Sequence, residues 1–327
     1  MTILYDDRWL GPHGIGRFAG EVARRCGMTP LRLPGRPLDI ADPWRLRRAL
    51  RARRPGHFFS PGFNAPLGWP CPFSLTLHDL IHLEVPEERS LVKQAYYRAV
   101  LRPALHRADL VLTVSDFSRQ RIADWAGLPP GRIVIAGNGV SPAFSPDGPC
   151  RDHRRPYLLY VGNRKPHKNV AGLLRAYAAS GIWREADLLL TGDLSDGLRR
   201  LVAELAVTAP VVPLGPVPEA DLPALYRGAL ALVMPSRYEG FGLPVVEAMA
   251  SGTPVLCSNR TALPEVGGDA VAYFDPDDED HFVAVLQSVT RTAWLADLRA
   301  RGLRRARRFD WDRVAARVMA GIAGAGA

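Results

Sequence analysis

The stretch Arg237-Tyr-Glu-Gly-Phe-Gly-Leu-Pro-Val-Val-Glu247 follows the apolar run Ala229–Met234, and together they predict a buried strand that turns directly into a helix. Gly240 and Gly242 let the backbone approach a ligand closely, and Pro244 suits the first turn of a helix. Unpaired amides at a helix start attract an anion. The stretch therefore predicts an α/β domain with an anion site at a strand's carboxyl end.

Two acids flank this helix start. Glu239 lies in the loop, and Glu247 lies about one turn into the helix among Val-Val-Glu-Ala-Met-Ala, where an acid is rarely buried unless it is paired or bound. Two acids beside an amide-lined phosphate site suit a sugar nucleotide, one for hydroxyls of the sugar and one for those of the ribose. The alternative is a helix start with incidental acids.

Short apolar strands alternate with helical stretches along the chain. The predicted strands are 3–5, 57–59, 73–77, 110–114, 133–135, 157–161, 187–191, 211–214, 231–234, 255–257 and 270–273. The predicted helices are 15–25, 90–105, 116–126, 170–179, 196–206, 219–227, 244–250 and 279–299. Such alternation favours parallel sheets covered on both faces, and two series favour two doubly wound, Rossmann-like domains.

The proline-rich stretch 141–156 predicts a linker, so the domains are expected at 1–150 and 151–308. A length of 327 residues also favours about two domains. The hydrophobic fraction of 47% and charged fraction of 23% exclude extensive disorder. The four cysteines form no CxxC pair, which argues against a structural zinc site or disulfide framework and favours a reducing, cytoplasmic location. We expect neither a secretory signal nor a membrane span.

The chain is strongly basic, with a formal net charge of +9. Only three of its 42 basic residues are lysines, so a general bias toward arginine is one explanation. An anionic partner is the other. Neither of two arginine clusters, at 45–54 and 301–308, is interleaved with aromatic residues, and no nucleic-acid-binding motif is present. An anionic membrane surface is thus favoured over a nucleic acid, and on a helix Arg47, Arg51 and Arg54 would form one basic stripe.

Three further strand ends carry candidate ligand residues. Gly14-Ile-Gly16-Arg-Phe-Ala fits a loose dinucleotide-binding pattern, with Asp39 downstream, but a phosphate-facing loop of another kind fits better than a nicotinamide or flavin site, and a structural turn is the third alternative. His78 ends an apolar strand, as either a buried structural histidine or a site residue. Ser115 follows a strand as either a helix cap or a site residue.

A basic loop follows the strand at 157–161. It contains Arg164, Lys165 and Lys168 before a helix that Asn169 could cap. Ligands bind at this end of the strands in open α/β sheets, so the loop is a candidate anion site; a solvated charged loop is the alternative.

Together these motifs resemble the retaining glycosyltransferases of family 4, which have the GT-B fold. The stretches that carry the resemblance are HGIGR (13–17), LHDL (77–80), VLTVSDFSRQRI (111–122), GNGV (137–140), YVGNRKPHKN (160–169), LGPVPEADLPALYRGALALVMPSRYEGFGLPVVEAMASGTPV (214–255) and LPEVGGDA (263–270). Within them, the E-x7-E spacing from Glu239 to Glu247 is specific to such enzymes.

The resemblance implies two facing domains with a nucleotide sugar bound mainly by the second. The implied catalytic residues are Glu239, His78, Lys168 and Arg164, the last replacing an arginine that the family usually has where Asn163 stands. Implied donor-binding residues are Gly14, Gly16, Gly162, Val217, Phe241, Gly242, Leu243 and Glu247. Ser115 and Asn138 are expected on the acceptor side, and the helix at 309–327 is expected to return to the first domain.

The implied reaction is transfer of a hexose with retention of configuration, without a cofactor or metal, because Lys168, Arg164 and helix amides can stabilise the leaving diphosphate. The sequence looks most like bacterial mannosyltransferases of polysaccharide assembly that use GDP-mannose. A glycan or lipid-linked glycan is the expected acceptor, with peripheral docking at the inner face of the plasma membrane. The alternatives are a rhamnosyl- or glucosyltransferase using a dTDP- or UDP-sugar and, more remotely, a dinucleotide-dependent oxidoreductase or a non-catalytic glycan-binding relative.

Overall fold

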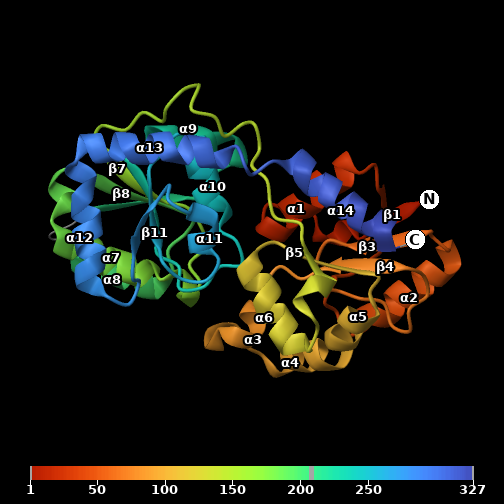
Figure 1. The fold of residues 1–327 in the computed structure, drawn as a ribbon. Coiled ribbons are helices and arrows are strands. Elements are labelled where there is room, and N and C mark those ends of the chain that lie inside the picture. The colour runs from red at the N-terminus through yellow and green to blue at the C-terminus, as the bar shows by residue number, and fades with distance from the viewer. Residues whose placement is uncertain (1, 206–209, 326–327) are drawn as a thin grey trace. The chain divides into compact units, whose positions relative to one another are not determined.

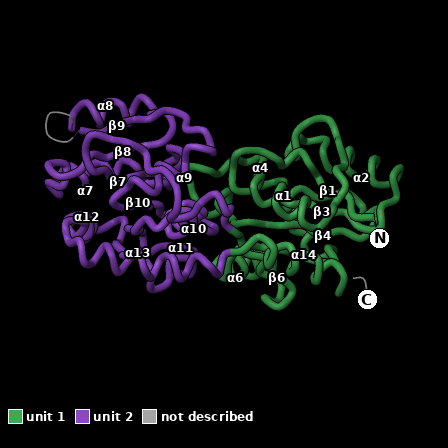
Figure 2. Tube along the Cα trace, turned by 90° about the horizontal axis from the view of Figure 1, so that it is seen from above, with its two compact units in different colours: residues 1–139, 310–327 green, residues 140–309 purple. Residues whose placement is uncertain are grey.

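The computed structural model describes residues 2–205 and 210–325. The chain forms two compact units, residues 1–139 with 310–327 and residues 140–309 (Figure 2). Each unit contains a six-stranded sheet in which all strand pairs are parallel. The predicted α/β class with two doubly wound sheets is therefore confirmed.

The first unit has the strand order β2-β1-β3-β4-β5-β6. Its strands are β1 (Ile3–Tyr5), β2 (Thr29–Pro30), β3 (His57–Ser60), β4 (Phe73–Thr76), β5 (Leu110–Thr113) and β6 (Ile133–Ile135). Its helices are α1 (Gly14–Arg25), α2 (Asp42–Arg53), α3 (Ile81–Glu84), α4 (Leu91–Tyr96), α5 (Arg102–Arg107), α6 (Asp116–Ala126) and α14 (Trp311–Ala325). A π-helical turn, Tyr97–Leu101, joins α4 to α5.

Alternate side chains of these strands enter two cores, because successive residues of a strand point to opposite faces. Leu4 and Phe58 pack with α2, α5 and α6. Ile3 and Phe59 pack with α1 and α14 on the other face (Figure 1).

The second unit has the strand order β12-β11-β10-β7-β8-β9. Its strands are β7 (Tyr157–Tyr160), β8 (Asp187–Thr191), β9 (Val211–Gly215), β10 (Ala231–Met234), β11 (Val255–Ser258) and β12 (Ala272–Phe274). Its helices are α7 (Val170–Ser180), α8 (Asp196–Leu205), α9 (Leu222–Gly228), α10 (Leu243–Ala250), α11 (Leu263–Gly267), α12 (Glu279–Gln287) and α13 (Thr292–Ala306). Helices α7, α8 and α12 share one core with the sheet, while α9, α11 and α13 contact α10 (Figure 1).

The predicted linker is not a free connection. Residues 140–156 belong to the second unit. There the guanidinium of Arg227 donates to the carbonyls of Pro149 and Ser145, and Phe144 packs edge-on against Tyr226. The unit boundary thus lies at 139/140, eleven positions before the predicted domain end.

Two other local predictions were wrong. The helix expected at 279–299 is interrupted by a 3₁₀ turn at Ser288–Thr290. There the Ser288 and Thr290 hydroxyls donate to the carbonyls of Ala284 and Gln287, and such bonds compete with continued helix. The two-residue strand β2 was not predicted. Among the described helices, none combines the length and apolar character needed to cross a membrane.

Candidate active site

The loops after β7 and β10 meet in the second unit because these two strands are hydrogen-bonded neighbours. From this pair the chain builds outward in both directions, through β8 to β9 and through β11 to β12. Ligands in open α/β sheets bind at the carboxyl ends of the strands where the order reverses in this way. The basic loop and the acid-bearing loop predicted from the sequence therefore lie at the favoured place.

Lys168 and Glu239 form an ion pair at this edge. Lys168 Nζ donates to Glu239 Oε1 over 2.6 Å, and the side chains are 16% and 11% exposed. The Arg237 N–H donates to the His167 carbonyl, which joins the two loops, and the Glu239 N–H donates to Thr261 Oγ1. The fold thus brings together a cation and an anion that lie 71 positions apart in the sequence.

The start of α10 lies directly after Glu239. Gly242 has a φ of +99°, and a Cβ there would lie 2.7 Å from the Leu263 side chain, so glycine is required. The N-cap residue Gly242 has no side chain to cap this helix, Pro244 has no N–H, and the Val245 N–H donates to the Gly242 carbonyl, so the Leu243 N–H is the first-turn amide that the helix itself leaves to another group. The Phe241 ring packs edge-on against Phe309, which holds the loop before Leu243 in place.

Glu247 is buried on the second turn of α10, with 3% of its surface exposed. Tyr226 on α9 donates its hydroxyl to Glu247 Oε2 over 2.9 Å. This contact supplies the partner that a buried acid requires. Glu247 still belongs to the same part of the unit as Glu239, because it lies on α10 and the N-terminus of α10 follows Glu239 in the chain.

Arg164 lies at the same sheet edge but is engaged with protein atoms. Its guanidinium stacks over the Tyr160 ring at 4.8 Å. Its terminal nitrogens donate to the carbonyls of Gly162, Thr191 and Gly192. Burial lowers the pKa of this guanidinium below its usual value. A role in binding diphosphate therefore requires Arg164 to exchange some of these carbonyl partners for phosphate oxygens.

The predicted capping role of Asn169 was wrong. This residue adopts a left-handed conformation with φ of +51°, and its amide donates to the Pro276 carbonyl instead of capping α7. Val217 is half-buried in the connection after β9, at the carboxyl edge of the same sheet.

His78 lies buried at the carboxyl end of β4 in the first unit. Its Nε2 is 2.9 Å from the Pro61 carbonyl oxygen, which can only accept, so Nε2 carries the hydrogen and donates. Burial lowers the pKa of His78 to about 4, and the ring packs edge-on against Phe18. His78 is therefore neutral at pH 7, with Nδ1 as a hydrogen-bond acceptor.

Gly14 and Gly16 open α1 directly after the β1 loop. A Cβ at Gly16 would lie 2.3 Å from the Gly11 carbonyl oxygen, so the loop backbone passes directly over the helix start. His13 caps the helix, because its Nδ1 accepts from the Gly16 N–H over 3.0 Å. Sequence analysis missed His13 as a cap, although a polar residue before a helix start was the available signal.

Ser115 follows β5 and Asn138 follows β6, at the carboxyl edge of the sheet in the first unit. Ser115 Oγ accepts from the Ser118 N–H over 3.1 Å and so caps α6. Asn138 is 6% exposed, and its side-chain oxygen is buried without a partner among the described atoms. An unsatisfied buried acceptor is costly unless a ligand or water donates to it, which agrees with a site role for Asn138.

Sequence comparisons match both units of the chain to family models of glycosyltransferases. Residues 7–144 match Glycosyltransferase Family 4, and residues 147–308 match Glycosyl transferases group 1. The chain is 37% identical to O-antigen chain mannosyltransferase B of Escherichia coli, covering 84% of this chain and 75% of that protein. The chain belongs to glycosyltransferase family 4.

Two further similarities extend this result. The glycosyltransferase is 30% identical to O-antigen chain mannosyltransferase RfbU of Salmonella typhimurium, over 73% of this chain and 66% of that protein. Anabaena HepE in complex with UDP-glucose superimposes with a TM-score of 0.80 at 16% identity, covering 99% of this chain and 100% of HepE. This match confirms the GT-B fold.

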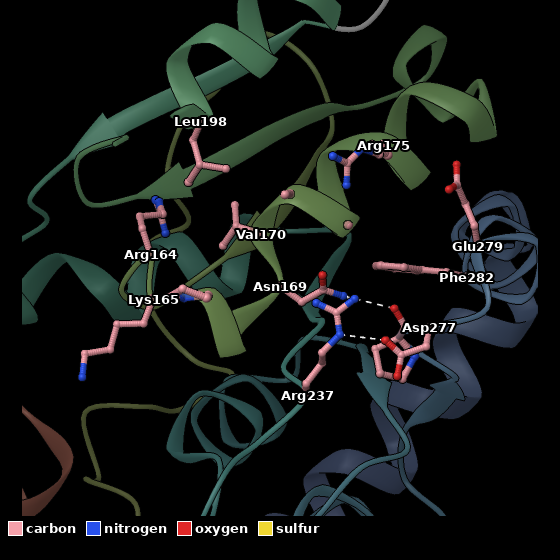
Figure 3. A pocket seen from close by; sticks show the side chains of 14 residues that line it. Arg164, Lys165, Asn169, Val170, Arg175, Leu198, Arg237, Asp277, Glu279 and Phe282 are labelled. Atoms are coloured by element: carbon pink, nitrogen blue, oxygen red, sulfur yellow. Dashed lines mark hydrogen bonds and ion pairs between the residues drawn. The ribbon is translucent and has the colours of Figure 1, made fainter. Parts of the chain in front are cut away.

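The second unit of the glycosyltransferase also contains a pocket of about 420 Å³ beside the N-terminus of α7 (Figure 3). Arg164 and Lys165 line it, as does Arg237, which pairs with Asp277 over 2.7 Å. Neither Glu239 nor Glu247 is among the lining residues. The pocket therefore lies beside the Lys168–Glu239 pair and does not contain it.

Sequence analysis missed the groups that orient the two acids. Thr261 holds the Glu239 backbone and Tyr226 contacts Glu247, but no local pattern marks either residue. In the part of the chain that the structure describes, no group of three His, Cys, Asp or Glu side chains is arranged to hold a metal ion.

Proposed function

We propose that this glycosyltransferase moves mannose from GDP-mannose to a growing glycan or lipid-linked glycan, with retention of anomeric configuration. The Lys168–Glu239 pair beside the uncapped start of α10 carries the proposal, because it offers a cation for a diphosphate and a carboxylate for sugar hydroxyls. The mannosyltransferase names of the relatives support the choice of sugar.

The proposed chemistry follows the charge that develops on the leaving group. The bond between the anomeric carbon and the diphosphate oxygen breaks while the acceptor oxygen attacks from the same face, and the acceptor proton passes to the departing phosphate. Lys168 and the Leu243 amide at the start of α10 stabilise the negative charge where it forms. Arg164 adds to this stabilisation once it releases its carbonyl partners.

Three further residues orient the substrates in this proposal. Glu239 accepts hydrogen bonds from the sugar hydroxyls, and Glu247 accepts them from the ribose. In the first unit, neutral His78 offers Nδ1 to a sugar hydroxyl. Hydrogen bonds to a charged carboxylate are stronger than those to a neutral group such as His78. Glu239 and Glu247 should therefore dominate the orientation of the donor.

The donor is tested by a thermal-shift screen over GDP-, UDP-, dTDP- and ADP-sugars, followed by transfer assays. We expect the largest shift and turnover with GDP-mannose. A larger shift and faster turnover with a UDP- or dTDP-sugar would contradict the choice of mannose. If neither donor hydrolysis nor transfer occurred with any of these sugars, the result would contradict a catalytic role.

We also propose that the reaction needs no metal ion, because Lys168 and Arg164 take the place of a cation at the diphosphate. Transfer should then survive EDTA, and proton NMR of the first-formed product should show the anomeric configuration of the donor. Loss of turnover in EDTA that Mg²⁺ or Mn²⁺ restores would contradict metal independence. An inverted product would contradict same-face attack.

A further inference from the structure

A groove of about 520 Å³ lies in the first unit between α3 and α6, apart from the residues placed above in the site. Leu80 and Leu83 form its apolar wall together with Trp125. Leu80 lies two positions after His78, and both follow β4, which ends at Thr76, so the groove begins just beyond the end of that strand. The groove is thus an extension of the carboxyl edge of the first sheet.

Trp125 is held in a fixed orientation. It is half-buried, and its ring packs edge-on against Tyr97, with centroids 5.7 Å apart and planes at 62°. Tyr97 is itself only 1% exposed, so the contact is anchored in the core. The groove therefore has a rigid aromatic surface that remains partly open to solvent.

The polar rim of the groove is also fixed by internal contacts. Arg121 Nε donates to Glu84 Oε1 over 2.6 Å, which ties α6 to α3. Arg89 Nε donates to the Leu83 carbonyl over 2.8 Å and a second nitrogen donates to the Glu84 carbonyl. Asp124 completes the rim and accepts from Gln120. Two acids balance two arginines, so the groove favours a neutral polar ligand over an anion.

We propose that this groove binds a neutral hexose unit of the acceptor glycan, at a position before the unit that is extended. A pyranose has an apolar C–H face and a rim of hydroxyls. The apolar C–H face matches Trp125, Leu80 and Leu83. The rim of hydroxyls matches the planar polar groups of Glu84 and Arg121. Apolar pockets with a few fixed polar groups are typical of sites for small ligands. The inference rests on the proposed transfer to a glycan.

The test compares acceptors of different length. Trp125→Ala should raise KM about tenfold for a mannose oligosaccharide of six or more units, leave KM for a disaccharide acceptor within twofold, and leave the donor KM unchanged. If Trp125 had only a structural role, its substitution would change KM for both acceptors together. Trp69→Ala is the matched control, because Trp69 is also half-buried in the first unit and stacks on Phe73.

A second variant keeps the test informative if Trp125→Ala does not fold. Glu84→Gln preserves side-chain shape, and it should raise KM for the long acceptor several-fold without affecting the disaccharide. Tryptophan fluorescence of the wild type titrated with mannohexaose, without donor, should change saturably, and Trp125→Phe should abolish that change. Equal KM changes for both acceptors, or no change for either in folded variants, would overturn the groove assignment. A wild type without transferase activity would instead contradict the proposed function.

Discussion

Lys168 and Glu239 share one hydrogen bond in a largely buried position, where a charge-assisted bond is less screened than on the surface. Each group has further capacity: the ammonium has two more donors, and the carboxylate has a second oxygen. The pair can therefore stay joined while it binds a donor diphosphate on one side and sugar hydroxyls on the other. This bifunctional arrangement makes Glu239 the most sensitive position in the second unit.

Glu239→Gln should lower kcat/KM by about 10- to 150-fold, which corresponds to the 1.5–3 kcal/mol of a hydrogen bond to a charged group. Glu239→Ala should abolish measurable transfer. Steady-state kinetics with the preferred donor measure the effect. The control is Asp277→Asn, which removes the partner of Arg237 at a half-exposed position and should change kcat/KM less than twofold. Kinetics like the wild type in Glu239→Ala would refute the site.

Glu247→Ala should act on donor binding more than on turnover, because Glu247 is expected at the ribose and away from the reacting carbon. We expect the donor KM to rise about tenfold or more, with kcat within a few-fold of the wild type. Tyr226→Phe is the control, since it removes only the hydroxyl that donates to Glu247 Oε2. If Tyr226→Phe reproduced the whole effect, the role of Glu247 would be to hold α9 against α10.

His78 should make the stability of the first unit depend on pH in acid. Its pKa in the folded chain is about 4, below the ordinary 6.5, because the ring is buried. As pH falls from about 6.5 toward 4, the unfolded chain takes up a proton that the folded chain does not. The free energy of unfolding should therefore fall by up to about 3 kcal/mol over this window and be constant above it.

His78→Gln should reduce that slope. The measurement is urea unfolding at pH 4.5, 5.5, 6.5 and 7.5, comparing the pH dependence and not the absolute stability. His13 and His57 also have pKa values lowered by burial, so part of the slope should persist in the variant. An unchanged slope would show that His78 titrates normally and is solvated in the folded chain.

At the residue scale, the sequence could predict which groups gather but not how each is oriented. Glu239 and Lys168 were predicted as site residues because each follows a strand, and parallel neighbours place their carboxyl ends together. The side chains of Arg164 and Asn169 depend on contacts with Thr191 and Pro276, which are distant in sequence. No local pattern encodes such contacts.

Among the elements, α2 bears out most of the exposed basic face that the composition predicted. The arginine cluster predicted a basic stripe at 47, 51 and 54. The structure exposes Arg51 and Arg54, together with Arg48, but it places Arg47 half-buried beside Gly68. Trp44 lies on the same helical face as Arg48 and Arg51, since positions 44, 48 and 51 are spaced by four and three. The exposed stripe is therefore amphipathic as well as basic.

We propose that α2 and the residues before it dock on an anionic membrane surface. Trp44 is 57% exposed and Ile40, just before the helix, is 81% exposed. Aromatic and aliphatic side chains next to arginines suit the interface of an anionic bilayer. The helix is rigidly placed, because Arg8 bridges Asp6 and Asp42 at its first turn over 2.6 and 2.5 Å.

We expect the protein to co-sediment with vesicles containing anionic lipid and not with neutral vesicles, with binding weakened by salt. Charge reversal at Arg48 and Arg51 should weaken binding by about 1 kcal/mol per residue, and Trp44→Ala should weaken it further. Reversal at Arg307 and Arg308, which lie in the other arginine cluster, is the control. Equal binding to both vesicle types, or none at low salt, would favour an acceptor that is not membrane-bound.

For the whole molecule, the chain passes from the first unit to the second at 139/140 and returns at 309/310. The resemblance to family 4 implied this return for the helix at 309–327. The structure gives it a specific role: Trp311, Val314, Val318 and Ile322 on α14 complete one of the two cores of the first unit. Their spacing of three and four residues forms a single helical face.

Trp311 links this terminal helix to the candidate site. Its ring lies 6.4 Å from that of Phe18, and Phe18 packs edge-on against His78 at 5.1 Å. Gly139 gives it space, since a Cβ there would lie 2.6 Å from the indole. The C-terminal helix therefore supports the position of His78, although 233 positions separate Trp311 from His78 in the sequence.

Trp311→Ala should lower the free energy of unfolding of the first unit by about 3–5 kcal/mol, the usual effect of truncating a fully buried aromatic residue. Trp311→Phe should cost much less, because the ring contact with Phe18 remains and the buried indole N–H has no partner among the described residues. Thermal unfolding with and without GDP-mannose measures both, with exposed Trp44→Ala as the control. We expect Trp311→Ala to shift only the transition of the first unit. Unfolding unchanged from the wild type would show that α14 contributes no packing energy to that unit.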